Sequence, residues 1–168
     1  MKSGKQDHNC GILVRMMKEG KKVGITFGAF DLCHAGHMLV FKEARTVCDY
    51  LIVGLQEDPS ATPADYRGKK KNKPVMSLEE RKVILESVKY IDEIHVYNSE
   101  QELYDLLVKL KPDIRIIGAD WKGKEFTGHD LPIEMYYNSR GHNFSTTALR
   151  ERIYEAEKAK RIERGLPL

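Results

Sequence analysis

Short apolar runs and helical patterns alternate along this chain. Five runs have the length and the β-branched or aromatic content of strands. They cover residues 22–30, 50–55, 91–97, 114–118 and 133–137. Helical patterns follow at residues 36–47, 77–90, 100–110 and 146–165. This order predicts a single Rossmann-like, doubly wound α/β domain with a parallel sheet and helices on both faces.

Two of the expected helices carry boundary signals. Ser77 is followed three residues later by Glu80, which is the spacing of a capping box. Pro112 ends the helix at residues 100–110. The apolar face that we predict for the helix after Ser77 consists of Leu78, Val83, Ile84, Leu85 and Val88.

A long polar stretch separates the second strand from that helix. Residues 56–74 contain three prolines and show no periodicity. A connection of this length is rarely idle in a compact domain, so we expect a functional loop. Its basic run RGKKKNK, residues 67–73, is either a solvated surface loop or part of a phosphate site.

Length and composition restrict the class of protein. A chain of 168 residues fits one domain, which we place at residues 21–155, between an extension at 1–20 and a helical tail at 156–168. No run of about 18 apolar residues and no small-residue cleavage site is present, so we expect neither a membrane span nor a secretory signal. The 28 basic and 25 acidic residues nearly balance, which gives no basis for nucleic-acid binding. Three widely spaced cysteines suit a reducing cytoplasm.

The segment FGAFDLCHAGHM, residues 27–38, is the strongest chemical feature. It lies where the first strand ends and the first helix begins, and ligands bind at this edge of such sheets. His34 and His37 could hold a metal, bond to the backbone or face a phosphate. Zinc is disfavoured because no second close pair supplies further ligands, so we expect no structural zinc. Gly28 and Gly36 allow close approach, and a helix start favours an anion.

The same segment resembles a known signature. Its residues Gly28, Phe30, Asp31, His34, Gly36 and His37 match the G-x-F-D-x-x-H-x-G-H pattern of the cytidylyltransferase family of nucleotidyltransferases. Arg140 and the run Ser145, Thr146 and Thr147 resemble the R-x-x-x-x-S-T-T element of that family. Residues 89–94 and 118–124 also look like family segments, so the resemblance covers roughly residues 23–153. It is closest to the members that use glycerol 3-phosphate.

The resemblance implies roles for individual residues. His34, His37, Lys71, Lys73 and Arg140 would stabilise the triphosphate as pyrophosphate leaves. The implied nucleotide site consists of Phe27, Gly28, Ala29, Phe30, Asp31, Gly36, Gly118, Asp120, Trp121, Ser145, Thr146 and Thr147. Ala29 and Lys89 stand where related sequences have threonine and arginine, and Lys89 is assigned to the acceptor.

Five of these residues also have structural readings. Asp31 would orient the phosphates or help to hold Mg²⁺, and it could equally cap a loop. Trp121 could serve packing alone. The hydroxyl groups of residues 145–147 could be helix caps.

The implied activity is transfer of CMP from CTP to a small phosphorylated alcohol similar to glycerol 3-phosphate, with Mg²⁺ and release of pyrophosphate. Two alternatives stay open: an adenylyltransferase that uses ATP and a phosphorylated sugar, and a nucleotide-binding module without turnover. The resemblance also implies a homodimer.

Overall fold

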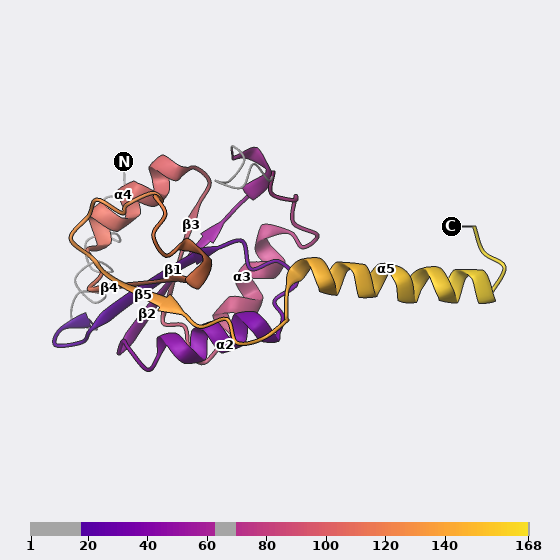
Figure 1. Cartoon of the computed structure of the whole chain (residues 1–168), viewed down its shortest axis with the longest axis horizontal. Helices are drawn as coiled ribbons and strands as arrows, with labels where there is room; N and C mark the ends of the chain where they lie inside the picture. The colour runs from indigo at the N-terminus through magenta and orange to yellow at the C-terminus, as the bar shows by residue number, and fades with distance from the viewer. Residues whose placement is uncertain (1–17, 63–69, 168) are drawn as a thin grey trace, which may run out of the picture.

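The computed structural model describes residues 18–62 and 70–167. Its centre is one parallel sheet in the order β3-β2-β1-β4-β5 (Figure 1). The strands are β1 (Val23–Gly28), β2 (Tyr50–Gln56), β3 (Glu93–Tyr97), β4 (Ile114–Gly118) and β5 (Glu134–Asn138). The sheet confirms the predicted doubly wound α/β class.

Helices cover both faces of this sheet. They are α2 (Ala35–Ala44), α3 (Leu78–Glu86), α4 (Glu100–Leu110) and α5 (Thr146–Glu163), with short 3₁₀ helices η1 (Pro59–Ala61) and η2 (Ala119–Trp121). Phe41 of α2 and Leu85 of α3 belong to one buried cluster, whereas Leu103 and Leu107 of α4 belong to the other. The two clusters are the cores on opposite faces, because successive side chains of a strand point to opposite sides.

Two sequence expectations differ from the structure. The helix expected at 36–47 ends at Ala44, because residues 45–48 turn back onto its last carbonyl groups. The Ser77–Glu80 capping box is present, but Val83 is 52% exposed and does not belong to the buried face of α3. Arg81, which the predicted apolar face did not include, is buried.

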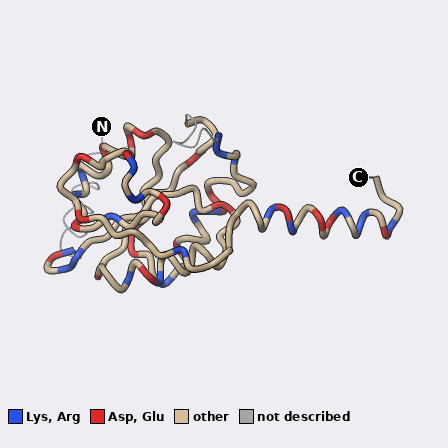
Figure 2. The backbone as a smooth tube through the Cα atoms, in the orientation of Figure 1, with Lys and Arg blue, Asp and Glu red and all other residues tan. Residues whose placement is uncertain are grey.

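Helix α5 projects away from the rest of the structure (Figure 1). Positively and negatively charged residues are interspersed along the helix (Figure 2), and none of its residues is buried. It runs without a break across residue 155, where we placed the end of the domain. Residues 1–17, most of the expected extension, lie outside the described part of the chain.

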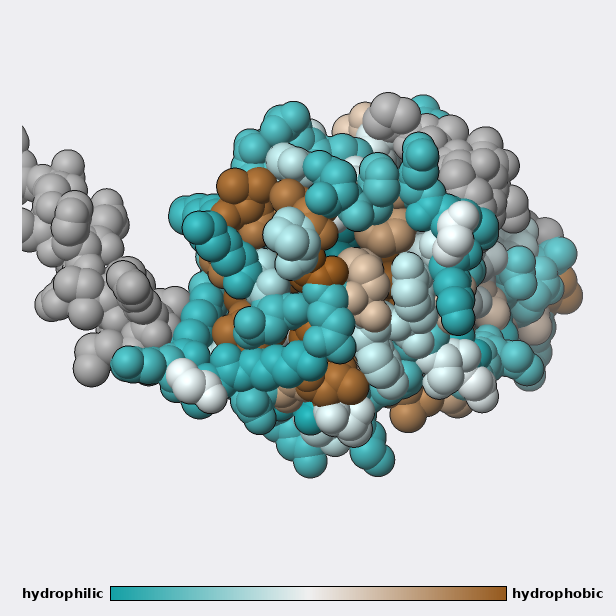
Figure 3. All heavy atoms as spheres, turned by 60° about the vertical axis from the view of Figure 1, so that its left-hand side comes forward, coloured by the Kyte–Doolittle hydropathy of each residue, from teal (hydrophilic) through white to brown (hydrophobic). Residues whose placement is uncertain are grey.

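The surface of the body is mixed in character. Hydrophilic side chains cover most of the face in Figure 3, with smaller hydrophobic areas between them. Within the described residues, no helix combines the length and apolar character needed to cross a membrane. The homodimer and the cytoplasmic location stay predictions.

Candidate active site

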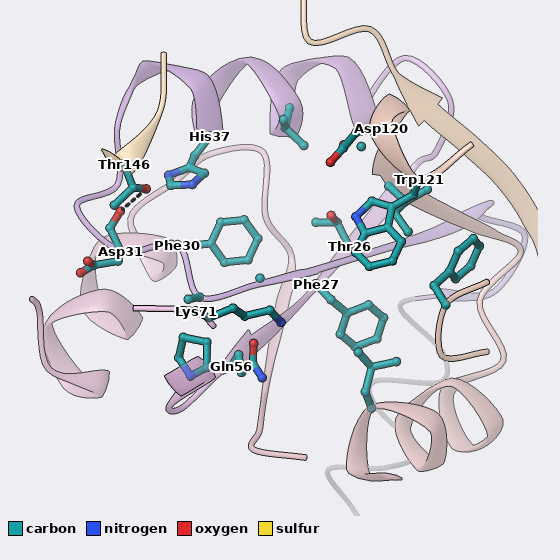
Figure 4. Close-up of a pocket in the computed structure, with 18 of the residues that line it drawn as sticks. Thr26, Phe27, Phe30, Asp31, His37, Gln56, Lys71, Asp120, Trp121 and Thr146 are labelled. Atoms are coloured by element: carbon teal, nitrogen blue, oxygen red, sulfur yellow. Dashed lines mark hydrogen bonds between the residues drawn. The ribbon is translucent and has the colours of Figure 1, made fainter. Parts of the chain in front are cut away.

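A cavity of about 710 Å³ opens at the carboxyl ends of the strands. The pleat of the sheet divides its lining into two sides. Thr26, Phe30 and His37 lie on the side of α2, and Phe27 lies on the opposite side of β1 (Figure 4). We call these the α2-side lobe and the α4-side lobe. The volume lies within the range of small-molecule sites and is large enough for more than one ligand group.

The two histidines of the signature form the cap of helix α2. His34 is the N-cap residue, and its Nδ1 accepts a hydrogen bond of 3.1 Å from the backbone N–H of Gly36. His37 Nδ1 accepts one of 3.4 Å from the backbone N–H of His34. The rings stack with centroids 4.0 Å apart. Because each Nδ1 is an acceptor, each neutral ring carries its proton on Nε2.

The Nε2 atoms are therefore donors, and the two differ in their partners. His34 Nε2 lies 3.3 Å from Thr146 Oγ1, to which it donates. Thr146 in turn donates to the backbone carbonyl of Asp31, as the dashed line in Figure 4 shows. His37 lines the cavity. The sequence offered bonding to the backbone and contact with a phosphate as separate roles for these histidines. In His37 the two are compatible, because Nδ1 bonds to the backbone and Nε2 remains a donor.

A third imidazole, that of His142, lies beside the rings of the two signature histidines, and the sequence did not predict it. A Cβ on Gly36 would approach its Cε1 to 2.8 Å and that of His34 to 2.9 Å. Glycine at position 36 therefore makes room for rings, in addition to the ligand access that the sequence suggested. His142 stands within the loop between Arg140 and Ser145, but no spacing rule connected it with the signature.

The environment keeps the imidazoles neutral. Burial lowers the pKa of His37 to about 3, with further lowering by the charges of His34 and Arg140. Burial and then His142 lower the pKa of His34. Both rings are therefore hydrogen-bond donors without charge at neutral pH.

The lowered pKa of His37 predicts a pH-dependent stability. Between pH 6.5 and about 3 the unfolded chain binds a proton at this residue that the folded chain does not, so acid favours unfolding. We expect the free energy of unfolding to fall by up to about 1.4 kcal/mol per pH unit in this window because of His37 alone. Urea titrations at several pH values give the free energy of unfolding as a function of pH. Below pH 6.5 it should fall less steeply with decreasing pH in His37→Asn than in the wild type, and above pH 6.5 the two proteins should show the same pH dependence. The same pH dependence of the free energy of unfolding in both proteins over the whole range would contradict the prediction.

Asp31 caps a loop, which is one of the roles that the sequence left open. It is 7% exposed, and its carboxylate accepts hydrogen bonds from the backbone N–H groups of Val75 and Met76 at 3.0–3.1 Å. Arg150 Nη1 lies 3.6 Å away. Asp31 thus fixes the segment that leads into α3 against the signature loop. Phe30 and Leu32 on either side have positive φ angles of 49°, which this fixed turn maintains.

Of the positively charged residues predicted for the site, some line the cavity and others do not. Lys71 lines the cavity and extends into it beside Gln56 (Figure 4). Arg140 also lines it, with Nη1 3.7 Å from Asp120 Oδ1. Lys73 is not part of the lining, and its carbonyl accepts from Arg150. Residues 67–69 of the basic run lie outside the described residues.

The remaining predicted residues fall into three groups. Those that line the cavity are Phe27, Gly28, Ala29, Phe30, Gly118, Asp120, Trp121, Thr146 and Thr147. Ser145 is the N-cap of α5, its Oγ accepting from the N–H of Ala148 at 3.1 Å, and is not in the lining. The structure does not bring Lys89 to this site. It lies exposed before the amino end of β3, at the opposite edge of the sheet, with Nζ 5.1 Å from the Tyr90 ring centroid.

Four buried polar residues at this edge were missed by sequence reasoning. Arg81 is 2% exposed and donates to the carbonyl groups of Ala29, Gln56, Glu57, Met76 and Ser77. Gln56, Arg115 and Asn138 line the cavity itself. For Gln56, Arg115 and Asn138 a signal was available, since each is a polar residue within or beside an apolar run, whereas Arg81 stands between two charged residues. Such a position does not by itself say which partner it meets.

Comparison with known proteins agrees with this geometry. The family described as cytidylyltransferase-like matches residues 25–152. Glycerol-3-phosphate cytidylyltransferase of Bacillus subtilis is 37% identical over 134 residues, which are 79% of this chain and 97% of that enzyme. The bifunctional protein HldE of Campylobacter concisus is 36% identical over 83% of this chain, which spans only 29% of that protein's length.

The fold also has solved counterparts. The crystal structure of a nicotinate-nucleotide adenylyltransferase from Vibrio parahaemolyticus, itself assigned provisionally, matches with a TM-score of 0.53. It is 16% identical and covers 81% of this chain and 88% of that one, so it supports the fold alone. The match over residues 25–152 and the near-complete coverage of the Bacillus enzyme together show that the chain belongs to the cytidylyltransferase-like family of nucleotidyltransferases.

Proposed function

We propose that the protein transfers CMP from CTP to a small phosphorylated alcohol such as glycerol 3-phosphate and releases pyrophosphate. The observation that carries the proposal is the position of His37. Its Nδ1 is occupied by the helix cap, which leaves the Nε2–H as a donor on the wall of the α2-side lobe. The similarity to the Bacillus enzyme over almost its whole length supports the choice of nucleotide and acceptor.

The reaction suits a site rich in donors. A phosphate oxygen of the acceptor attacks the α-phosphorus of CTP, and the bond to the bridging oxygen of the β-phosphate breaks. The acceptor phosphate is already an anion, so the step needs no general base. Catalysis then depends on positioning and on stabilising the charge that spreads over the phosphate oxygens.

Several groups are placed for that task. His37 lines the cavity together with Thr146 and Thr147, the first two residues of α5. The helix start adds a partial positive charge. Lys71 and Arg140 add full positive charges from two different loops. In our proposal His34 positions the site through its bond to Thr146, because its Nε2 is already engaged.

Mg²⁺ is part of the proposal, but the protein offers it few ligands. The described residues contain no group of three or more His, Cys, Asp or Glu side chains that could hold a metal. The Asp31 carboxylate is bonded to two backbone N–H groups. Mg²⁺ commonly binds through substrate phosphates and water with one or two carboxylates. We therefore propose that it arrives on the triphosphate, and no step above depends on a protein cage.

Release of pyrophosphate tests the proposal directly. The protein is incubated with Mg²⁺, each of the four nucleoside triphosphates and either glycerol 3-phosphate or a phosphorylated sugar, and pyrophosphate is measured with time. We expect release with CTP above the others, and the largest rise in melting temperature with CTP, because a tighter ligand stabilises the folded state more. Release with ATP and a phosphorylated sugar would favour the adenylyltransferase alternative. Nucleotide binding without release from any acceptor would favour the binding module.

A further inference from the structure

The α4-side lobe contains a buried cation that the proposed reaction at His37 does not use. Arg115 lies in the middle of β4, and its neighbour on β1 is Ile25. Its side chain points to the α4 face of the sheet, because Ile114 and Ile116 on either side belong to the core on the α2 face. It is 5% exposed and lines the cavity.

Aromatic rings hold the guanidinium in a fixed orientation. Its Cζ lies 5.2 Å from the centroid of Phe27 and 5.1 Å from that of Phe126. Phe27 can lie there because Gly54 on the neighbouring strand has no Cβ; one would collide with the ring. With rings near it, the guanidinium can meet a ligand through its N–H edge. A planar fork held in this way is preorganised for a carboxylate or phosphate.

The charge of Arg115 has no direct counter-ion in the described part of the chain. Its hydrogen bond there is to the carbonyl oxygen of Thr127, whereas a guanidinium has five N–H donors. No carboxylate of the described residues lies within 4.0 Å of it. Glu100 acts on it from a greater distance and accepts a hydrogen bond from Thr127 Oγ1. Burial lowers the pKa of Arg115 to about 10, which leaves it charged at neutral pH.

A second unpartnered donor lies on the same side of the sheet. Gln56 ends β2 beside Tyr97 of β3, and its side chain is on the α4 face, since Leu55 belongs to the other core. It is 2% exposed and lines the cavity, and its Nε2 has no hydrogen-bond partner in the described structure. Buried donors without partners destabilise a fold unless a ligand satisfies them. Figure 4 places Gln56 on the same side of β1 as Phe27, away from His37.

We propose that Arg115 binds a second anionic group of the acceptor, a carboxylate or phosphate at the end away from the phosphate that reacts. Gln56 lines the same lobe closer to the carboxyl ends of the strands, where it can donate to another part of the same ligand. The inference rests on the proposed function in taking this ligand as the acceptor. Two lobes on opposite sides of β1 then hold the two substrates, with the triphosphate beside His37 and the far end of the acceptor beside Arg115. Among phosphorylated alcohols, the preferred acceptors are accordingly those with a second anion, phosphorylated hydroxy acids and bisphosphates, and glycerol 3-phosphate is a weaker member of the class.

Matched pairs of compounds test this without turnover. In each pair one member carries an anion where the other carries a hydroxyl group: 3-phosphoglycerate and glycerol 3-phosphate, 6-phosphogluconate and glucitol 6-phosphate, fructose 1,6-bisphosphate and fructose 6-phosphate. Dissociation constants are measured calorimetrically on the full chain, with and without CTP. We expect tighter binding of the anionic member, by about tenfold or more, in at least one pair. The first two pairs report a carboxylate and the third a phosphate.

Substitutions assign the preference to Arg115. Arg115→Met is expected to bring the ratio within a pair close to one, and Arg115→Gln provides the same loss of charge if the methionine variant fails to fold. The matched control is Lys109→Gln, which removes an exposed positive charge from α4 far from the cavity lining. It should keep the wild-type ratio.

The outcomes separate this inference from the proposed function. Equal binding within all three pairs in the wild type, or a preference that persists in the Arg115 variants, would overturn the inference even if CTP is turned over. A preference that depends on Arg115 supports the anion subsite, and it would do so even if no nucleotide released pyrophosphate.

Discussion

Replacing His37 with asparagine is expected to lower the rate of pyrophosphate release by about 100-fold or more while the helix cap is kept. The amide oxygen of asparagine lies as far from the backbone as imidazole Nδ1, so it can still accept from the N–H of His34. It cannot supply the Nε2–H donor, which stands one bond further out. The loss of a donor aimed at the developing charge typically has an effect of this size. Steady-state kinetics at saturating CTP and acceptor measure it.

Glutamine at the same position is the matched control. Its amide nitrogen stands at the distance of Nε2, so His37→Gln should recover part of the rate while it weakens the cap. A larger fall in His37→Gln than in His37→Asn would indicate that the helix cap, rather than the donor, matters. A His37→Asn protein with a rate near the wild type would remove His37 from the proposed chemistry.

Replacing Arg81 with methionine is expected to lower the free energy of unfolding by about 3–5 kcal/mol. The guanidinium satisfies carbonyl oxygens that end β1 and β2 and begin α3, at distances of 2.6–3.3 Å. Methionine fills a similar volume but leaves these buried acceptors without donors, each at a cost of about 1–3 kcal/mol, partly relieved by water. Since domains are stable by only about 5–15 kcal/mol, the loss is a large fraction of the total. Denaturant titration with a fixed slope measures it.

Lys82→Met is the control for this change. Lys82 is the next residue on α3, and its ammonium lies 3.8 Å from Glu86 on the surface. Exposed ion pairs of this kind contribute less than about 1 kcal/mol, so the control should stay close to the wild type. If Arg81→Met lost no more stability than Lys82→Met, the carbonyl groups would have to be satisfied in another way.

The fold was predictable to within a few residues because its signals are local. The helix at 100–110 and the strand at 114–118 coincide with α4 and β4, since Ser99 and Pro112 bracket the helix and Gly118 ends the strand. The expected burial of Val83 was wrong, since the apolar residues of α3 exceed what one face can bury. Arg81 lies three residues after Leu78 and four before Leu85, on the buried stripe, but a charged residue there does not signal that carbonyl groups of distant strands will surround it.

The site could be predicted in part for a related reason. The signature and the S-T-T element are local, and most of their side chains do line the cavity. Lys89 was assigned by its place in a motif, and strand direction puts it at the other edge of the sheet. Gln56 and Arg115 were not predicted as site residues because β2 and β4 are buried on both faces. Parallel strands of this kind lose the alternation that would show which side chains share a lobe.

The sequence by itself determined the order of elements, the family and the presence of two histidines at a helix start near phosphate-binding elements. Those properties depend on periodicity and spacing along the chain, which folding does not alter. Only the tertiary structure decided which nitrogen of each imidazole faces the cavity, that Asp31 fixes a loop, and that Arg115, Phe27 and Gln56 share one lobe. These depend on register and hydrogen bonds between distant segments, which exist once the sheet has formed.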